Sequence, residues 1–218
     1  MIKDGFPELT LPQVEEDEIT LYIGNRLIQT FLCTPEALEE LTIGHLYCRG
    51  LISSLRQISQ IEICRNEIKV ELKKEDAMEA PPSEPFHNPS LTFLQNLAGQ
   101  IQNLAEKYRH HGGIHCAALS DGLNIVVLYE DVGRHNAFDK AIGAALNQGI
   151  DLSRLIYFSS GRINSEIAEK AAACRLSLLV SRSIATNRAC AIAGRTETTI
   201  IGRIESKAPI LYTACTRD

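Results

Sequence analysis

Residues 130–140, EDVGRHNAFDK, concentrate charged and hydrogen-bonding side chains between two apolar stretches. An apolar run precedes Glu130 and Asp131, Gly133 permits a sharp bend, and a helical pattern follows. A strand that ends in acids, turns at glycine and enters a helix is a common place for the site of an α/β protein. The free N–H groups and the positive dipole end of that helix, beside Arg134, favour an anionic ligand.

The same residues also fit a purely structural arrangement. In that alternative Asp131 pairs with Arg134, while Asn136 caps the helix and His135 fills space. Short polar side chains cap helix ends without binding any ligand. The segment by itself leaves the two interpretations open.

Two further strand-to-helix turns are rich in serine, glycine and arginine. Residues 159–162 read SSGR and residues 181–183 read SRS, each at the end of an apolar run. Small residues let the backbone approach a ligand, and arginine pairs with phosphate. Because ligands bind outside the carboxyl ends of parallel strands, we expect these turns to gather with residues 130–135 around an anionic, nucleotide-like ligand. The alternative is that Arg134, Arg162 and Arg182 pair with Glu130, Asp131, Asp139 and Glu166.

His115 and Cys116 are neighbours in GGIHCAAL, residues 112–119. Adjacent residues of a strand point to opposite faces, so we do not expect His115 to act as the base for Cys116. Cys116 fits a small buried residue as well as a reactive thiol, since buried thiols are generally inert. His115 is the stronger candidate, because a hairpin would bring it to the turn at residues 130–135.

Composition narrows the function classes. The 218-residue chain has 44% hydrophobic residues and a net charge of −5, so it can bury a sizeable core and lacks the basic excess of a nucleic-acid binder. No apolar run approaches the ~20 residues of a membrane span, and the first ten residues lack a signal peptide's apolar core. We therefore expect a cytoplasmic protein without nucleic-acid or membrane partners, whose seven cysteines are reduced.

No metal site is predicted. His45 and Cys48 are one helical turn apart, and further histidines precede Cys116, but the chain has no Cys-x-x-Cys. Most of the other cysteines are expected to be small buried hydrophobic residues: Cys33, Cys64, Cys174 and Cys190.

The order of the expected elements indicates the fold. Hairpins are expected around residues 24–25, 65–66 and 121–122, which are turn-forming pairs between apolar runs. Thr34, Pro35 and Glu36 predict the N-cap and first turn of a helix, and Ser90 begins another helix that extends to His111. Later helical patterns (135–147, 164–174, 186–194) alternate with strands (155–159, 176–180, 198–201), and a last strand is expected at 209–212.

Such alternation predicts crossover connections and a partly parallel sheet. We expect an α/β protein in two domains. Residues 1–87 would form a small α+β region of hairpin, helix and hairpin, followed by a proline-rich linker. Residues 88–218 would form a layered mixed sheet with helices on both faces.

EDVGRHNAFDK, with GGIHCAAL before it and SSGRINSEIAEKAA and LVSRSIAT after it, closely resembles the FdhD/NarQ family of formate dehydrogenase accessory proteins. The resemblance covers most of the chain and is strongest from Gly112 to Ser183. It implies a homodimeric sulfur carrier that takes sulfur from a cysteine desulfurase. The acceptor would be molybdenum bis(molybdopterin guanine dinucleotide), bound transiently before it enters formate dehydrogenase.

The resemblance also implies a cytidine-deaminase-like fold for residues 88–218. Deaminase chemistry itself is excluded, because the His-x-Glu of those enzymes would require glutamate at Ala117 and their Pro-Cys-x-x-Cys has no counterpart.

The chain departs from the family pattern in two places. Family members carry a Cys-x-x-Cys on the loop that corresponds to residues 73–89, and this interval contains no cysteine. A sulfur relay needs an accessible thiolate. Residues 203–208, RIESKA, stand where members have glycine- and arginine-rich sequence, although Arg203 and Lys207 remain able to contact phosphates.

Three functional hypotheses follow. The first is a sulfurtransferase that uses another thiol, Cys116, with Cys48 or Cys215 in reserve. The second is a non-catalytic protein that holds the guanine-dinucleotide end of the cofactor or docks to formate dehydrogenase. The third is an unrelated enzyme for a phosphate ligand, with Glu130, His135 and Asp139 as acid and base groups.

The candidate catalytic residues are Cys116 and His115. In the expected site arginines and serines recognise guanine nucleotide and phosphate, and acids and histidines orient the ligand and handle protons. The cofactor-binding candidates are Glu130, Asp131, Gly133, Arg134, His135, Asn136, Asp139, Lys140, Ser160, Gly161, Arg162, Ser181, Arg182, Ser183, Arg203 and Lys207.

Overall fold

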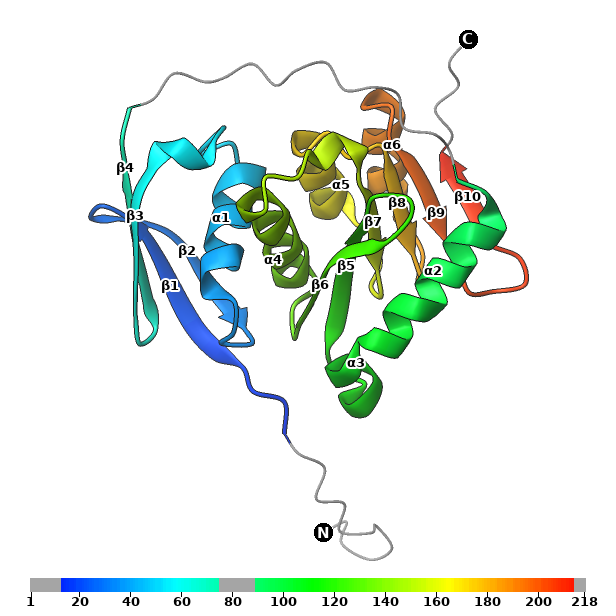
Figure 1. Ribbon diagram of the computed structural model, residues 1–218, viewed down its shortest axis with the longest axis horizontal. Helices are drawn as coiled ribbons and strands as arrows, with labels where there is room; N and C mark the ends of the chain where they lie inside the picture. The colour runs from blue at the N-terminus through cyan, green and yellow to red at the C-terminus, as the bar shows by residue number, and fades with distance from the viewer. Residues whose placement is uncertain (1–12, 75–88, 214–218) are drawn as a thin grey trace, which may run out of the picture.

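The computed structural model describes residues 13–74 and 89–213, which form two mixed β-sheets with two packed helices between them (Figure 1). The expected α/β class, with helices on both faces of a layered mixed sheet, is confirmed. Within the described residues, every helix is too short or too polar to cross a membrane.

The smaller sheet has the strand order β2-β1-β4-β3. Its strands are β1 (Asp17–Ile23), β2 (Arg26–Cys33), β3 (Ile58–Cys64) and β4 (Glu67–Leu72). Both predicted hairpins are confirmed, with Gly24 and Arg65 at positive φ in their turns. β1 and β4 pair in parallel, and one face of the sheet packs on helix α1 (Leu38–Cys48).

Helix α1 begins later than the sequence predicts. Thr34 does not cap it, because tertiary contacts occupy Thr34: its N–H donates to the Asp131 carboxylate and its carbonyl accepts from the Lys140 ammonium. The chain then turns through Ala37 at φ 51° before the helix starts at Leu38. The prediction of a Thr34 cap and a Pro35 first turn is therefore wrong.

α1 packs directly on helix α4 (Arg134–Asn147), and Figure 1 shows the two side by side between the sheets. Glycines permit the contact. A Cβ added to Gly44 would lie 1.8 Å from the Asp139 carbonyl oxygen, and one added to Gly143 would lie 1.9 Å from the Glu40 carbonyl oxygen. The two backbones therefore touch, and this contact positions the small sheet against the rest of the chain.

The larger sheet has the strand order β10-β9-β8-β7-β5-β6. Its strands are β5 (His115–Ser120), β6 (Ile125–Asp131), β7 (Ile156–Ser159), β8 (Leu178–Ser181), β9 (Thr199–Gly202) and β10 (Ile210–Thr213). β7, β8 and β9 are parallel, as the alternating pattern predicts, and the other pairs are antiparallel. The crossover helices are α5 (Ser165–Ala173) and α6 (Asn187–Arg195).

Two apolar layers cover the larger sheet. α4, α5 and α6 pack on one face, and α2 (Leu91–Leu104) packs on the other. The predicted helix from Ser90 to His111 is divided: Ala105 leaves the helical conformation at ψ 85°, and a short helix α3 (Glu106–His111) follows. Ser90 is the N-cap and Gly112 ends α3, as predicted.

The expected domain boundary at residues 87 and 88 stays a prediction. The strands of the two sheets come from opposite sides of it, and the contact of α1 with α4 crosses it. Residues 75–88, which include most of the expected proline-rich linker, lie outside the described residues.

Candidate functional site

The predicted site segments meet at one edge of the larger sheet. The register pairs His115 with Asp131, Ala117 with Ser159, and Ser159 with Ser181. The start of β5 and the ends of β6, β7 and β8 therefore lie together. This is the convergence that the strand-end argument predicts.

Polar side chains pack closely around Gly161 where these segments meet. A Cβ on Gly161 would lie 3.1 Å from Arg134 Cδ and 3.2 Å from His115 Nδ1. The Ser160 hydroxyl lies 3.3 Å from His115 Nδ1. We call these four residues, His115, Arg134, Ser160 and Gly161, the Gly161 cradle.

Arg134 has an unsatisfied group in this cradle. Its Nε is buried and has no hydrogen-bond partner among the described residues. A buried donor without a partner costs roughly 1–3 kcal/mol, which an anionic oxygen at this position would offset. Burial lowers the pKa of His115, and the nearby Arg134 lowers it further, so His115 is neutral near pH 7.

A pocket lies beside the cradle on the α2 side of the sheet. Ser160 lines it together with Cys116, Tyr108, Arg182 and residues of α2. The Arg182 guanidinium bonds to the Glu205 carboxylate at 2.8 Å and to the Tyr108 hydroxyl, and it lies over the Tyr108 ring. The pocket thus joins a cation and an aromatic ring to the polar edge of the sheet.

Cys116 faces this pocket but is only 5% exposed. Burial raises the pKa of its thiol to about 11. Cys116 packs with the α2-side layer while His115 contacts Arg134 on the other side, as strand alternation predicts. Ser160 nevertheless connects them, because its hydroxyl also accepts the Cys116 N–H at 3.0 Å.

Asp131 and Lys140, predicted as ligand-binding residues, pair with each other in the interior and do not face the cradle. Both are fully buried, and the Lys140 ammonium lies 2.6 Å from the Asp131 carboxylate. That ammonium also donates to the Thr34 carbonyl. The alternative pairing of Asp131 with Arg134 is wrong too, since Lys140 and the N–H groups of Thr34 and Gly133 occupy the Asp131 carboxylate. Gly133 serves as the N-cap residue of α4.

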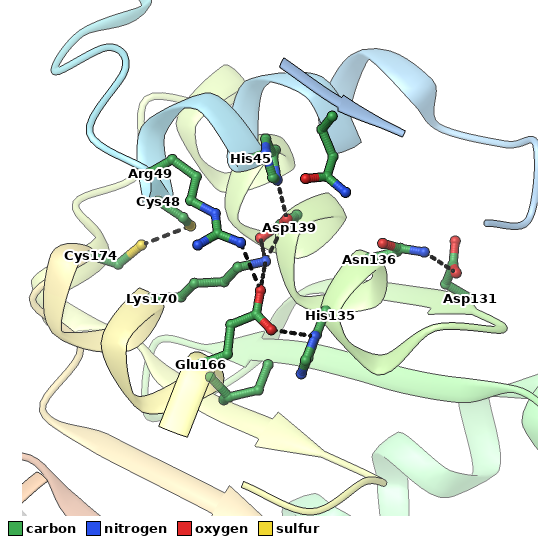
Figure 2. A network of polar contacts seen from close by, with 12 residues as sticks. His45, Cys48, Arg49, Asp131, His135, Asn136, Asp139, Glu166, Lys170 and Cys174 are labelled. Carbon is green, nitrogen blue, oxygen red and sulfur yellow. Dashed lines mark hydrogen bonds and ion pairs between the residues drawn. The ribbon is translucent and has the colours of Figure 1, made fainter. Parts of the chain in front are cut away.

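Asp139, also predicted as a cofactor contact, is an interior residue as well. Its carboxylate bonds to the Lys170 ammonium through both oxygens and to His45 Nδ1 at 3.1 Å (Figure 2). Asp139 is 1% exposed, so the acid or base role that we considered for it has no access to a ligand. This group binds α1, α4 and α5 together.

Glu130, His135 and Asn136 have structural partners. The Glu130 carboxylate accepts from the backbone N–H groups of Lys107 and Tyr108 and so caps α3. His135 Nδ1 lies 3.0 Å from the Glu166 carboxylate, and burial lowers the His135 pKa. The Asn136 amide donates to the Leu32 carbonyl and to Asp131, so the expected capping role for Asn136 is wrong.

Of the other predicted site residues, Ser181 stabilises the turn at Gly161, and three cations are exposed at the surface. The Ser181 hydroxyl is buried, donates to the Gly161 carbonyl at 2.7 Å and accepts the Ser183 N–H, so it shapes the turn instead of meeting a ligand. Three predicted cations are exposed at or after strand ends: Arg162, Arg203 and Lys207. Only Arg134 and Arg182 are held against the cradle and the pocket.

Sequence reasoning missed several residues of this region. Tyr108 and Glu205 flank Arg182 in the pocket, and neither stands in a recognisable motif. Lys170 could have been found, because helical spacing places it on the buried face with Ile167 and Ala171. Within the described residues, no three His, Cys, Asp or Glu side chains are grouped as metal ligands would be.

Comparison with known proteins identifies relatives. The sequence profile of the FdhD/NarQ family matches residues 14–89 and 77–217. The sulfur carrier protein FdhD of Shouchella clausii is 29% identical over 93% of this chain and 88% of its own length. The protein of the same name from Staphylococcus aureus (strain JH9) is 30% identical over 91% of this chain and 86% of its own length.

A solved structure shares the fold. The crystal structure of a formate dehydrogenase accessory protein from Desulfotalea psychrophila has a TM-score of 0.79 to this chain. It covers 92% of this chain and 87% of its own, at 22% sequence identity. At this identity the likeness concerns the arrangement of helices and strands.

Proposed function

Because the chain belongs to the FdhD/NarQ family, we propose that it is a formate dehydrogenase accessory protein that binds a guanine-nucleotide cofactor at the Gly161 cradle. One observation supports this assignment most: the buried, unpartnered Nε of Arg134 beside the Gly161 backbone. A phosphate oxygen is the acceptor that such a guanidinium binds best.

The cofactor that the family implies is molybdenum bis(molybdopterin guanine dinucleotide), bound transiently. Its phosphates would lie against Ser160 and Arg134, whose side chain packs on Gly161. Exposed Arg162 would supply a further positive charge. When bound, the cofactor supplies a metal centre that accepts sulfur, and this chain's residues anchor and orient its nucleotide end.

The neighbouring pocket supports a planar ring next to the phosphates. Tyr108 offers an aromatic surface, and the Glu205 carboxylate is an acceptor of the kind that the N–H groups of guanine require. Arg182 holds both of these side chains. We therefore assign the base to the pocket and the phosphates to the cradle.

The second candidate function is sulfur carriage through Cys116, since the Ser160 hydroxyl interacts with the Cys116 thiol and lies 3.3 Å from Nδ1 of neutral His115. The Cys116 proton would pass through the Ser160 hydroxyl to His115. The thiolate would then attack the outer sulfur of a donor persulfide. The donor's S–S bond breaks, the donor thiolate takes the proton from His115, and Cys116 becomes a persulfide.

The raised pKa and low exposure of Cys116 weigh against this chemistry in the resting protein. Residues 73–89 contain no cysteine that could replace it. We therefore place nucleotide binding first. The family resemblance supports formate dehydrogenase as the protein served, with a cysteine desulfurase and a second copy of the chain as further partners.

Calorimetric titration of the full chain with GDP tests the binding function. Arg134→Ala should weaken GDP binding about 10- to 100-fold, as expected for loss of a charge-assisted hydrogen bond. Arg26→Ala, which removes an exposed arginine of β2, should leave binding unchanged. Unaltered affinity in both Arg134→Ala and Arg162→Ala would overturn the cradle assignment.

Sulfur carriage has a separate readout. The chain is incubated with a cysteine desulfurase and labelled cysteine, and the persulfide is mapped by mass spectrometry. Label on Cys116 that is lost in Cys116→Ser and reduced in Ser160→Ala supports sulfur carriage. If the chain binds GDP with full affinity but no cysteine carries the label, the result supports nucleotide binding and contradicts sulfur carriage.

A further inference from the structure

Two cysteine thiols that the proposed function does not use meet in the interior. Cys48 is the last residue of α1, and Cys174 is the residue after α5. Their sulfur atoms lie 3.5 Å apart although 126 residues separate them in the sequence (Figure 2). Both are free and buried.

Polar contacts join α5 to α1 and α4 next to the thiol pair. The Arg49 guanidinium, directly after Cys48, lies 3.0 Å from the Glu166 carboxylate of α5. Glu166 also contacts His135 of α4, and Lys170 joins α5 to Asp139 (Figure 2). The thiol pair thus lies inside a junction of α1, α4 and α5.

We propose that Cys48 and Cys174 are an oxidation site, at which peroxide converts the thiol pair into an intramolecular disulfide that fastens α1 to α5. The present separation is that of unbonded sulfurs, so they must approach by about 1.5 Å to reach the ~2.05 Å of an S–S bond. Both cysteines are at helix ends, which open more readily than helix centres.

The reaction balances with hydrogen peroxide as the oxidant. The thiolate of one cysteine attacks a peroxide oxygen, the O–O bond breaks, and the departing hydroxide takes the thiol proton and leaves as water. The second thiol attacks the resulting sulfenic sulfur and displaces its oxygen as a second water molecule. Two thiols lose two electrons in total, and one peroxide gains them.

The surroundings keep the pair reduced until the junction opens. Burial and the contact with Cys174 raise the pKa of Cys48 well above its ordinary value, and Asp139 adds to this effect. The closed pair therefore holds its protons and reacts slowly, since the thiolate is the reactive form. Loss of the Arg49–Glu166 ion pair should loosen the α1 end and accelerate oxidation.

The cross-link would tie the small sheet's helix to the larger sheet. It would close a loop of more than 120 residues, which strongly restricts the unfolded chain. The melting temperature of the oxidised protein should rise by about 5–15 °C. The disulfide would also restrict the motion of α5, the helix that follows the Gly161 turn, so α5 would be more rigid in the oxidised protein.

The test uses the full chain, fully reduced and then exposed to dilute hydrogen peroxide. Trypsin releases Cys48 and Cys174 on separate peptides that end at Arg49 and Arg175, so a disulfide is detected as a joined peptide pair under non-reducing conditions. We expect that pair to form, to disappear with dithiothreitol, and to form several-fold faster in Arg49→Gln. The melting temperature should rise on oxidation and return on reduction.

Matched variants locate the effect. Cys174→Ala should abolish both the joined peptides and the rise in melting temperature, whereas Cys64→Ala, which removes an exposed thiol, should keep both. The measurement on the unmodified chain does not depend on the folding of any variant. Peroxide treatment that leaves both thiols free for alkylation after unfolding, while Cys64 is oxidised, would overturn the proposal.

Discussion

Gly44 of α1 and Asp139 of α4 are in backbone contact, so close that a Cβ on Gly44 would lie 1.8 Å from the Asp139 carbonyl oxygen. The same Asp139 sends its side chain to His45 and Lys170. One residue of the charged motif therefore fixes the junction of three helices with both its backbone and its carboxylate.

Gly44→Ala should destabilise the protein by about 3 kcal/mol or more, because the new methyl group meets backbone that cannot move aside cheaply. Urea unfolding measures the change. The control is Gly99→Ala in α2, where a Cβ meets nothing within 4 Å. That variant should gain about 0.5–1 kcal/mol from helix propensity, and equal losses in both variants would contradict the packing described.

Lys170→Met should cost about 3–5 kcal/mol of folding free energy, because it leaves the Asp139 carboxylate buried without its cation. Arg49→Ala removes a more exposed ion pair and should cost less than about 1 kcal/mol. Chemical denaturation of the two variants compares them directly. If both variants lost less than about 1 kcal/mol of folding free energy, the buried Asp139 carboxylate would not need the Lys170 ammonium for stability.

His115 should contribute a pH dependence of stability below neutral pH. Burial, and then Arg134, lower its pKa in the folded chain, so the unfolded chain binds the proton more readily below about pH 6.5. Stability should therefore be complete above that pH and fall as the pH drops toward the folded pKa. His115→Gln should flatten this part of the curve of melting temperature against pH, and exposed His110→Gln should leave it unchanged.

Cys116 should react slowly with iodoacetamide near neutral pH, and its rate should continue to rise up to about pH 11, where burial has placed its pKa. Exposed Cys64 in the same chain serves as the reference thiol and should react faster at pH 8. Peptide mapping by mass spectrometry follows both. Rapid labelling of Cys116 at pH 7 would show that the resting thiol is activated.

The elements of the fold follow largely from local pattern. Alternation and turn pairs around Gly24 and Arg65 define the first hairpins, and the strand–helix alternation after β6 defines the parallel strands. The start of α1 and the break at Ala105 were missed. Both depend on remote groups, since Thr34 bonds to Asp131 and Lys140 and the Glu130 carboxylate caps α3.

The sequence predicts which segments of the candidate site meet, but it does not predict which of their charged side chains are buried. The strand-end rule places His115, Ser160 and Gly161 together, because it follows from topology alone. It does not tell a ligand-facing charge from a buried one. The sequence gives no sign that Asp131, Asp139 and Lys140 are buried while Arg134 is not. Their partners include Thr34 and His45, which lie about 100 residues away in the sequence.

The hydrogen bonds from the N-terminus of α3 to the Glu130 carboxylate also fix one wall of the pocket. Tyr108, whose N–H the carboxylate receives, is also a wall of the pocket, so the wall is anchored to the tip of β6. A guest that pushed this ring outward would have to pull on the strand leading into α4. Glu130 thus connects the Tyr108 wall of the pocket, through the end of β6, to the start of α4.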